Sequence, residues 1–198
     1  MKRVYVATSN RGKLRDFVAA AQGKIEILPL PDFSSLPAVE EDGATFEENA
    51  RKKAEYYSRL VPEEIVLADD SGLEVDALGG APGVHSARYA TPDKSENASD
   101  AANNARLLRE LEQVPDAARR ARFVCVIAVA RDGNVLQTLR GQAEGRMLYK
   151  PRGSGGFGYD PLFQFPKLGK TFAELTPEEK AEVSHRGQAF RKFLDWIE

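Results

Sequence analysis

Two adjacent aspartates, Asp69 and Asp70, follow the apolar run IVLA at residues 65–68. Carboxylates this close repel each other, and burying either one without a partner is costly. A positive group is therefore expected beside the pair, and it could be a lysine, a helix end or a metal ion. The acidic segment 40–42 could join the pair in holding a hard cation such as Mg²⁺, which prefers carboxylate oxygens, water and phosphates. The alternatives are a solvated charge run at 40–42 and a role without function for the two aspartates.

The segment TSNRGK, residues 8–13, falls where an expected strand ends and an expected helix begins. Ligands of open α/β sheets bind at such junctions, and the free N–H groups of a helix N-terminus attract anions. Asn10 adds a donor, Gly12 lets a backbone approach closely, and Lys13 adds a positive charge. These features suit a phosphate, although the spacing is not that of a Walker A loop. The alternative is an ordinary capped turn with a solvated lysine.

Glycines surround two aromatic residues in GSGGFGYDP, residues 153–161. Such a loop can bring the rings of Phe157 and Tyr159, together with backbone groups, against a flat ligand. Stacking of a nucleobase is a common use of this arrangement. The alternative is a mobile hairpin connection.

Further polar residues occur on two expected helices. Asn49 and Lys53 are four apart and would share one helix face, which either contributes to a site or is simply solvated. The C-terminal segment carries three more candidates: Lys180, His185 and Arg186. Gly187 weakens a helix by about 1 kcal/mol, so its presence in this segment indicates a local break that serves a contact.

The pattern of apolar residues predicts an α/β protein. Strands are expected at 3–7, 25–30, 65–69 and 162–163, with 73–75 either continuing the third strand or returning from it. Helices are expected at 14–21, from 45 to about 60, at 99–111 and from 177 nearly to the end. Residues 121–130 and 135–143 should form a β-hairpin, because Asp132-Gly133-Asn134 is a type I′-like turn signal. The late hairpin favours a mixed sheet over a purely parallel one.

Length and composition restrict the class of protein. The 198 residues suit one domain, or one domain with a modest second lobe. The net charge of −2, from 28 basic and 30 acidic residues, argues against a large nucleic-acid-binding surface. No apolar run approaches the ~18 residues of a membrane span, and MKRVYVATSN is not a signal peptide, so a cytoplasmic protein is expected. Cys125 should be a buried small hydrophobe, and one cysteine with two histidines cannot make the usual zinc site.

Taken in order, several segments resemble the inosine triphosphate pyrophosphatase family, also called the Ham1-like or non-standard purine nucleoside triphosphate pyrophosphatases. The segments are VATSNRGK, TFEENARKKA, ADDSGLEVDALGGAPGVHSARY, GGFGYDPLF and LTPEEKAEVSHRGQA. The resemblance implies a two-lobed α/β fold, with a long curved mixed β-sheet flanked by helices and the active site in the cleft between the lobes. It implies that residues 1–198 form a single pyrophosphatase domain and that the protein is a homodimer.

The resemblance also implies an activity and a set of site residues. The activity is Mg²⁺-dependent hydrolysis of ITP, dITP and XTP to the nucleoside monophosphate and pyrophosphate, which removes deaminated purines from the nucleotide pool. Asp70 is the implied proton acceptor and metal ligand, and Glu41 the implied second metal ligand. The implied substrate-binding residues are Thr8, Ser9, Asn10, Arg11, Gly12, Lys13, Lys53, Ser71, Phe157, Gly158, Tyr159, Asp160, Lys180, His185 and Arg186.

Two other classes of function stay open at this point. One is a nucleotide-binding regulator without turnover, and the other is a phosphatase or transferase that acts on a different phosphorylated metabolite. Within the family reading, side chains that donate hydrogen bonds would select O6 of a 6-keto purine over the amino group of adenine. The sequence does not separate the roles of Asp69 and Asp70.

Overall fold

The computed structural model describes residues 2–93 and 96–198. Its strands are β1 (Arg3–Val6), β2 (Glu26–Pro29), β3 (Val66–Val75), β4 (Arg120–Arg131), β5 (Asn134–Met147), β6 (Phe163–Phe165) and β7 (Lys170–Thr171). Its α-helices are α1 (Arg11–Ala21), α2 (Phe46–Ser58), α3 (Asp100–Glu110), α4 (Pro177–Val183) and α5 (His185–Ile197). Short 3₁₀-helices are η1 (Phe33–Ser35), η2 (Asp76–Leu78), η3 (Gly83–Arg88), η4 (Asp116–Ala118) and η5 (Phe172–Glu174).

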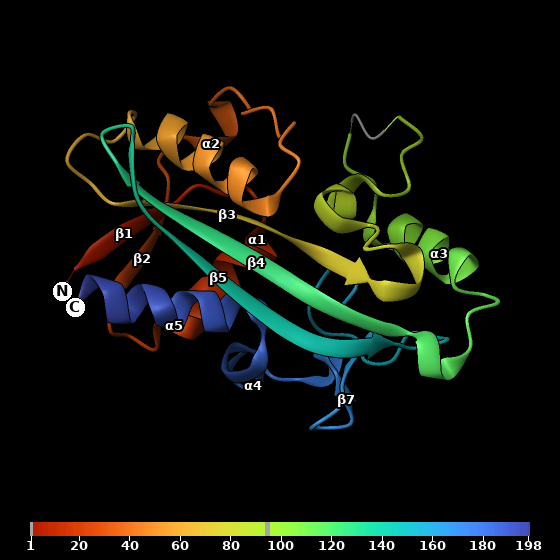
Figure 1. Cartoon of the computed structure of the whole chain (residues 1–198). Helices are drawn as coiled ribbons and strands as arrows, with labels where there is room; N and C mark the ends of the chain where they lie inside the picture. Colours follow the sequence, from red (N-terminus) through yellow and green to blue (C-terminus); the bar gives the residue numbers. More distant parts are fainter. Residues whose placement is uncertain (1, 94–95) are drawn as a thin grey trace. The chain divides into compact units, whose positions relative to one another are not determined.

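The described strands form one seven-stranded sheet in the order β2-β1-β3-β4-β5-β6-β7 (Figure 1). β1 runs parallel to β2 and to β3, whereas the pairs β5-β6 and β6-β7 are antiparallel. β4 and β5 are joined by Asp132 and Gly133, whose φ angles of 52° and 79° are the positive values that a type I′ turn requires. The α/β class, the mixed sheet and the late hairpin predicted from the sequence are confirmed.

The chain divides into two compact units. Unit 1 contains the chain up to Asp70, residues Cys125–Gly141 and residues Ala181–Glu198, and unit 2 contains Ser71–Val124 and Gln142–Lys180. β3, β4 and β5 each contribute residues to both units. That the whole chain is a single pyrophosphatase domain stays a prediction.

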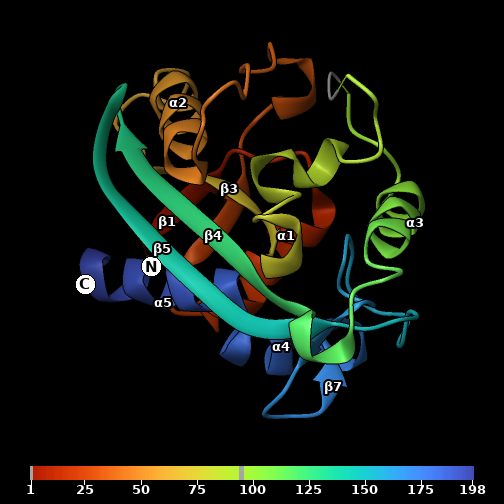
Figure 2. The ribbon, with the colours of Figure 1, turned by 45° about the vertical axis from the view of Figure 1, so that its right-hand side comes forward.

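In unit 1, α2 covers one face of the strands, and α1 with α5 covers the other (Figures 1 and 2). The apolar stripes of α1 and α5 meet where the rings of Phe17 and Phe190 pack with centroids 5.6 Å apart. Both rings are fully buried with Val4 and Val6 of β1 and Leu67 of β3. These three helices begin at polar caps: Asn10 caps α1, Thr45 caps α2 and Ser184 caps α5.

The third strand does not end at residue 69, and of the two alternatives for 73–75 the structure shows the continuation. β3 runs without interruption from Val66 to Val75, so Asp69 and Asp70 lie near its middle. Aspartate and glycine are poor strand formers, but β-propensity yields to context when cross-strand pairing and compensating charges are present. β3 is flanked in the sheet by β1 and β4, and both aspartates have cationic neighbours, described below.

The C-terminal segment is two helices rather than the one expected, and the predicted local break lies at Ser184, with Gly187 in the first turn of the second helix. α4 ends at Val183, and Ser184 starts α5 by accepting a hydrogen bond from the N–H of Gly187 at 3.1 Å. A Cβ on Gly187 would lie 1.8 Å from the carbonyl oxygen of Ala181. Glycine is therefore required for the close approach of the two helices, and the break places His185 and Arg186 in the first turn of α5.

Unit 2 contains α3, η3 and the hairpin β6-β7. The rings of Phe123, Phe163 and Phe172 pack together in its core, with centroids 4.7 to 5.7 Å apart. α3 lies beside η3 (Figure 2), and the amide of Asn103 links them by donating to the carbonyl of Ala87 at 3.0 Å and accepting from the N–H of Ala90 at 2.7 Å. These bonds anchor α3 to the rest of its unit.

Two expectations from composition can be compared with the structure. Cys125 is fully buried on β4, as predicted, and this burial, together with the neighbouring carboxylate of Asp69, raises the thiol pKa to about 12. Within the described residues, no helix combines the length and the apolar character needed to cross a membrane.

Candidate active site

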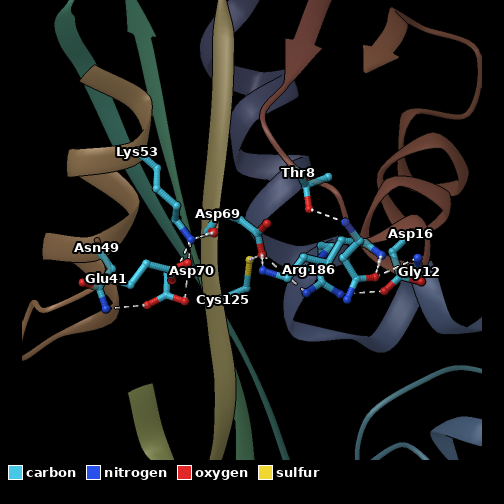
Figure 3. Close-up of polar contacts among 12 residues, drawn as sticks. Thr8, Gly12, Asp16, Glu41, Asn49, Lys53, Asp69, Asp70, Cys125 and Arg186 are labelled. Atoms are coloured by element: carbon cyan, nitrogen blue, oxygen red, sulfur yellow. Dashed lines mark hydrogen bonds and ion pairs between the residues drawn. The ribbon is translucent and has the colours of Figure 1, made fainter. Parts of the chain in front are cut away.

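The two aspartates of the doublet point to opposite sides of β3 (Figure 3). Successive side chains of a strand alternate between its faces, so adjacent residues cannot share one environment. Asp70 faces a group that includes α2, whereas Asp69 faces α1 and α5 (Figure 3). The repulsion expected from the sequence is thus resolved by separation, and each carboxylate has its own cations.

Asp70 belongs to a cluster with Glu41, Asn49 and Lys53, which we call the Asp70 cluster. The ammonium of Lys53 lies 3.0 Å from Oε2 of Glu41 and 3.9 Å from Oδ1 of Asp70. It also donates to the backbone carbonyl of Asp69 at 2.7 Å. Asn49 donates through Nδ2 to Oδ2 of Asp70 at 3.0 Å. The cluster therefore brings two carboxylates together around one buried ammonium.

Local structure explains why α2 can supply two of these side chains. Asn49 and Lys53 are one helical turn apart and share a face, as predicted. Oδ1 of Asn49 accepts from the N–H of Gly43 at 2.8 Å, which ties the loop that carries Glu41 to the helix. A Cβ on Gly43 would lie 2.6 Å from that oxygen, so glycine is needed for the contact.

The electrostatics of the cluster favour a basic carboxylate. Burial raises the pKa of Asp70 above its ordinary value, and Lys53 offsets this only in part. Burial alone would lower the pKa of Lys53, but Asp70 and Glu41 outweigh it and raise the pKa instead, so the side chain stays positive. A carboxylate whose pKa is raised accepts protons more readily than an ordinary one, which suits a general base.

The Asp70 cluster also fits a hard divalent cation. Its ligating atoms are carboxylate oxygens, and Mg²⁺ is usually held by one or two carboxylates, with water and substrate phosphates completing the shell. Among residues 2–93 and 96–198, no group of three or more histidine, cysteine or acidic side chains is placed to hold a metal. Glu41 and Asp70 therefore suit an ion that shares its coordination with a substrate better than one held by protein alone.

On the other side of β3, Asp69 lies in a buried ion network with Lys13, Asp16 and Arg186. Oδ2 of Asp69 is 3.0 Å from the ammonium of Lys13 and 3.5 Å from Nη2 of Arg186. Nη1 of Arg186 is 2.6 Å from Oδ2 of Asp16. Burial alone would raise the pKa of Asp69, but Lys13 and Arg186 outweigh it and hold the pKa well below its usual range. This network joins α1, β3 and α5.

The segment 8–13 is a capped turn, as in the alternative reading, but its lysine is not solvated. Oδ1 of Asn10 accepts from the N–H groups of Gly12 and Lys13 at 2.8 and 3.0 Å, and Oγ1 of Thr8 accepts from the N–H of Asn10 at 3.2 Å. Ser9, Asn10 and Arg11 are exposed. The side chain of Lys13 is only 18% exposed, because it is paired with Asp69.

In unit 2, the aromatic loop, residues Phe157–Asp160, is held by several contacts rather than mobile. Oδ2 of Asp160 accepts from the N–H of Phe157 at 3.0 Å and from the ammonium of Lys180 at 2.7 Å. The same ammonium lies 4.8 Å from the centroid of the Phe157 ring. The hydroxyl of Tyr159 donates to the carbonyl of Ser86 at 2.8 Å. Phe157 and Gly158 are partly exposed, whereas Tyr159 and Asp160 are buried.

Gly156 shows why glycine precedes the aromatic loop. Its φ of +72° is in the left-handed region, and an added Cβ would lie 2.1 Å from Oδ2 of Asp160. Glycine is therefore required both by the backbone conformation and by the close approach of the carboxylate.

The structure groups the predicted residues into separate local sets. Unit 1 brings together Glu41, Lys53 and Asp70, and separately Lys13 and Arg186; His185 is buried next to Arg186. Unit 2 brings together Phe157, Asp160 and Lys180, while Ser71 follows Asp70 on β3 and is half-buried.

Two partners lie outside the set of site residues that the sequence predicts. The sequence predicts only that Asn49 shares a helix face with Lys53, yet Asn49 donates a hydrogen bond to Asp70. Asp16 has no predicted role, although it pairs with Arg186 across 170 residues of sequence. The i,i+4 spacing to Lys53 indicates that Asn49 could belong to the site, whereas no pattern in the sequence indicates that Asp16 would pair with Arg186.

The central strand β3 of this mixed α/β sheet carries the buried carboxylate of Asp70 next to Lys53, an arrangement that suits the binding of phosphate and a hard cation. Residues 4–196 match the family model of the Ham1 family, and the chain belongs to that family.

Known proteins resemble the chain over nearly its whole length. A dITP/XTP pyrophosphatase of Acidobacterium capsulatum is 53% identical over 196 residues, covering 96% of each chain. A dITP/XTP pyrophosphatase of Geobacter sulfurreducens is 53% identical and covers 100% of this chain and 97% of its own. Among solved structures, a HAM1 protein from Coxiella burnetii superposes with a TM-score of 0.83 at 40% identity and covers 100% of this chain and 98% of its own.

Proposed function

We propose that this protein hydrolyses dITP, ITP and XTP to the nucleoside monophosphate and pyrophosphate. The observation that carries the proposal is the Asp70 cluster, in which a buried carboxylate lies beside a second carboxylate and a buried lysine. Relatives that are 53% identical over nearly the full length bear the name dITP/XTP pyrophosphatase, which supports this choice of substrate. In a cell, the reaction would keep deaminated purines out of DNA and RNA.

In the proposed mechanism, Asp70 accepts a proton from the attacking water, and Glu41 and Asp70 would hold Mg²⁺. When bound, the ion neutralises phosphate charge and lowers the pKa of nearby water. Lys53, which contacts both carboxylates, keeps them in place and supplies a positive charge to the phosphates. Because Asn49 donates to Oδ2 of Asp70, it orients the carboxylate and leaves Oδ1 toward Lys53.

The remaining predicted residues have proposed roles in binding. Thr8, Ser9, Asn10, Arg11, Gly12, Lys13 and Ser71 would contact mainly the phosphates. Phe157, Gly158, Tyr159, Asp160, Lys180, His185 and Arg186 would contact the base. Part of this set is already engaged inside the protein: Asp160 holds Lys180, and Arg186 is paired with Asp16 and Asp69.

Base selection should depend on hydrogen-bond donors. Lys180 and Arg186 carry only donors and His185 can donate, so they would pair with O6 of hypoxanthine or xanthine and oppose the amino group of adenine. Sites built around one specific hydrogen bond can discriminate by about 10⁴–10⁵. Guanine shares O6, so its rejection would need exclusion of the 2-amino group, a role that we assign to the aromatic loop.

A substrate panel tests the proposed function. With Mg²⁺, dITP and XTP should be hydrolysed with kcat/KM about 10⁴ times that for dATP, and the first products should be the monophosphate and pyrophosphate. Chelation by EDTA should abolish turnover, and excess Mg²⁺ should restore it, because the reaction would require the Mg²⁺ that Glu41 and Asp70 hold. Release of orthophosphate with a nucleoside diphosphate would indicate an ordinary phosphatase. Binding of dITP without any turnover would indicate a regulator.

We also propose that the protein is a homodimer, on the basis of its family. Sedimentation velocity should give a single species near twice the 21.8 kDa chain mass at micromolar concentration. A monomer alone at that concentration would contradict the proposal. The expected cytoplasmic location stays a prediction from the sequence.

A further inference from the structure

Two side chains of α3 hold the backbone of the aromatic loop from outside it. Oδ2 of Asp100 accepts from the N–H of Gly158 at 2.7 Å. Nδ2 of Asn104 donates to the carbonyl of Gly158 at 2.9 Å. Asp100 and Asn104 are four residues apart and therefore lie on one face of the helix. Both polar groups of a single glycine backbone are thus bonded to one helix.

Gly158 is the position in the loop where such support matters most. Its φ of +59° is in the left-handed region, and an added Cβ would meet no atom within 4 Å, so glycine is needed for conformation and not for space. Its neighbours are held by their own contacts, Phe157 through Asp160 and Tyr159 through Ser86. Gly158 has no side chain, so only its backbone can be fixed. The bonds to α3 therefore set the turn between the two aromatic rings.

An ordinary role in helix stability does not account for both residues. Asp100 in the first turn of α3 would stabilise the helix dipole wherever its side chain pointed. Asn104 lies inside the helix, where asparagine is an unfavourable residue. Its Oδ1 is buried with no hydrogen-bond partner among the residues that the structure describes, which is itself a cost. The hydrogen bond to the carbonyl of Gly158 explains why asparagine occupies this helical position.

α3 itself is held in place by hydrogen bonds and by a buried side chain. Asn103 joins α3 to the η3 region through two hydrogen bonds, and the side chain of Leu107, also on α3, is fully buried. Residues that support a binding loop are effective when they are fixed by their own packing. Asp100 and Asn104 project from an element that meets this condition.

We propose that Asp100 and Asn104 are positioning residues that fix the aromatic loop through Gly158 and thereby set the preference for one purine base over another. This rests on the proposed function, in which the loop contacts the base. The two residues do not touch the substrate. Loss of either should loosen the loop, which weakens binding and the exclusion of the 2-amino group of guanine, and should leave the chemistry at Asp70 unchanged.

Kinetics of Asp100→Ala, Asn104→Ala and the double variant test the proposal. Each single variant should raise KM for dITP about 3- to 10-fold, the range expected for one lost hydrogen bond, with kcat within about twofold of wild type. The ratio of kcat/KM for dITP to that for dGTP should fall by a similar factor. Because both residues hold the same glycine, the double variant should lose less than the product of the two single effects.

Two control variants separate positioning from general effects on the helix. Asp100→Asn keeps an acceptor oxygen for the N–H of Gly158 and should restore nearly normal KM and selectivity. Arg109→Ala changes an exposed residue of the same helix and should alter neither. Unchanged KM and selectivity in both alanine variants, or a fall in kcat at constant KM, would overturn the proposal.

A measurement without substrate separates failure of this proposal from failure of the proposed function. Amide hydrogen exchange, followed by NMR, should show faster exchange of Gly158 in Asp100→Ala than in wild type, with Ala102 and other α3 amides unchanged. Equal protection of Gly158 in both proteins would overturn the positioning role. Wild-type protein that does not hydrolyse dITP or XTP would instead overturn the proposed function and would leave the exchange result standing.

Discussion

Replacement of Asp70 by asparagine is expected to lower kcat for dITP by about 10²–10⁴-fold, the usual loss when a general base is removed. The amide has nearly the same shape and can still bond to Asn49, but it cannot accept a proton from water. Burial raises the pKa of Asp70, which means that its charge is disfavoured in the folded protein. A neutral residue at this position should therefore leave the melting temperature unchanged or raise it.

The measurement is steady-state kinetics over a range of Mg²⁺ concentrations, together with thermal unfolding. Asp195→Asn, which neutralises an exposed aspartate on α5, is the matched control and should keep normal kcat. If Asp70→Asn retains more than about a tenth of the wild-type kcat, Asp70 is not the base. If high Mg²⁺ alone restores the full rate, Asp70 serves only to hold the metal.

Replacement of Asp69 by asparagine, in contrast, should lower the stability of the folded protein. Asp69→Asn removes the shared partner of Lys13 and Arg186 in a network where Asp69 and Arg186 are about 1% exposed. Loss of one partner from a buried ion pair typically costs 3–5 kcal/mol, because the remaining charge stays buried without compensation. We therefore expect the free energy of unfolding at pH 7 to fall by roughly that amount.

Denaturant unfolding of wild type and Asp69→Asn at several pH values, with EDTA present, checks this expectation. The folded-state pKa of Asp69 is lowered, so its stabilising effect is fully present above its unfolded value of about 3.9 and is lost as the pH falls through the folded value. The difference between the two proteins should be constant from pH 7 to about pH 5 and should shrink in stronger acid. Equal stability at pH 7, or a difference that grows on acidification, would contradict the assigned role. Asp195→Asn again serves as control.

Local sequence signals were sufficient for most of the secondary structure. The helices expected from residues 45 and 99 begin there, with Thr45 and Ser99 as their caps, and Asp132-Gly133 forms the hairpin turn. These features depend on residues close in sequence, whose preferences act whatever the rest of the chain does. The same holds for Gly187, which indicates the break found at Ser184, although the contact with Ala181 that requires the glycine is visible only in the structure.

The sequence by itself determined that two carboxylates must be compensated at Asp69 and Asp70, and that a lysine, a helix end or a metal could do it. Only the tertiary structure decided that the two have different partners, because β3 continues through the doublet and alternation sends the side chains to opposite faces. Asp16 and Arg186, or Asp100 and Gly158, meet only when the chain has folded. Periodicity and capping are local and can be recognised in a single sequence, whereas the pairing of distant charges depends on which elements pack together, and no pattern of neighbouring residues encodes it.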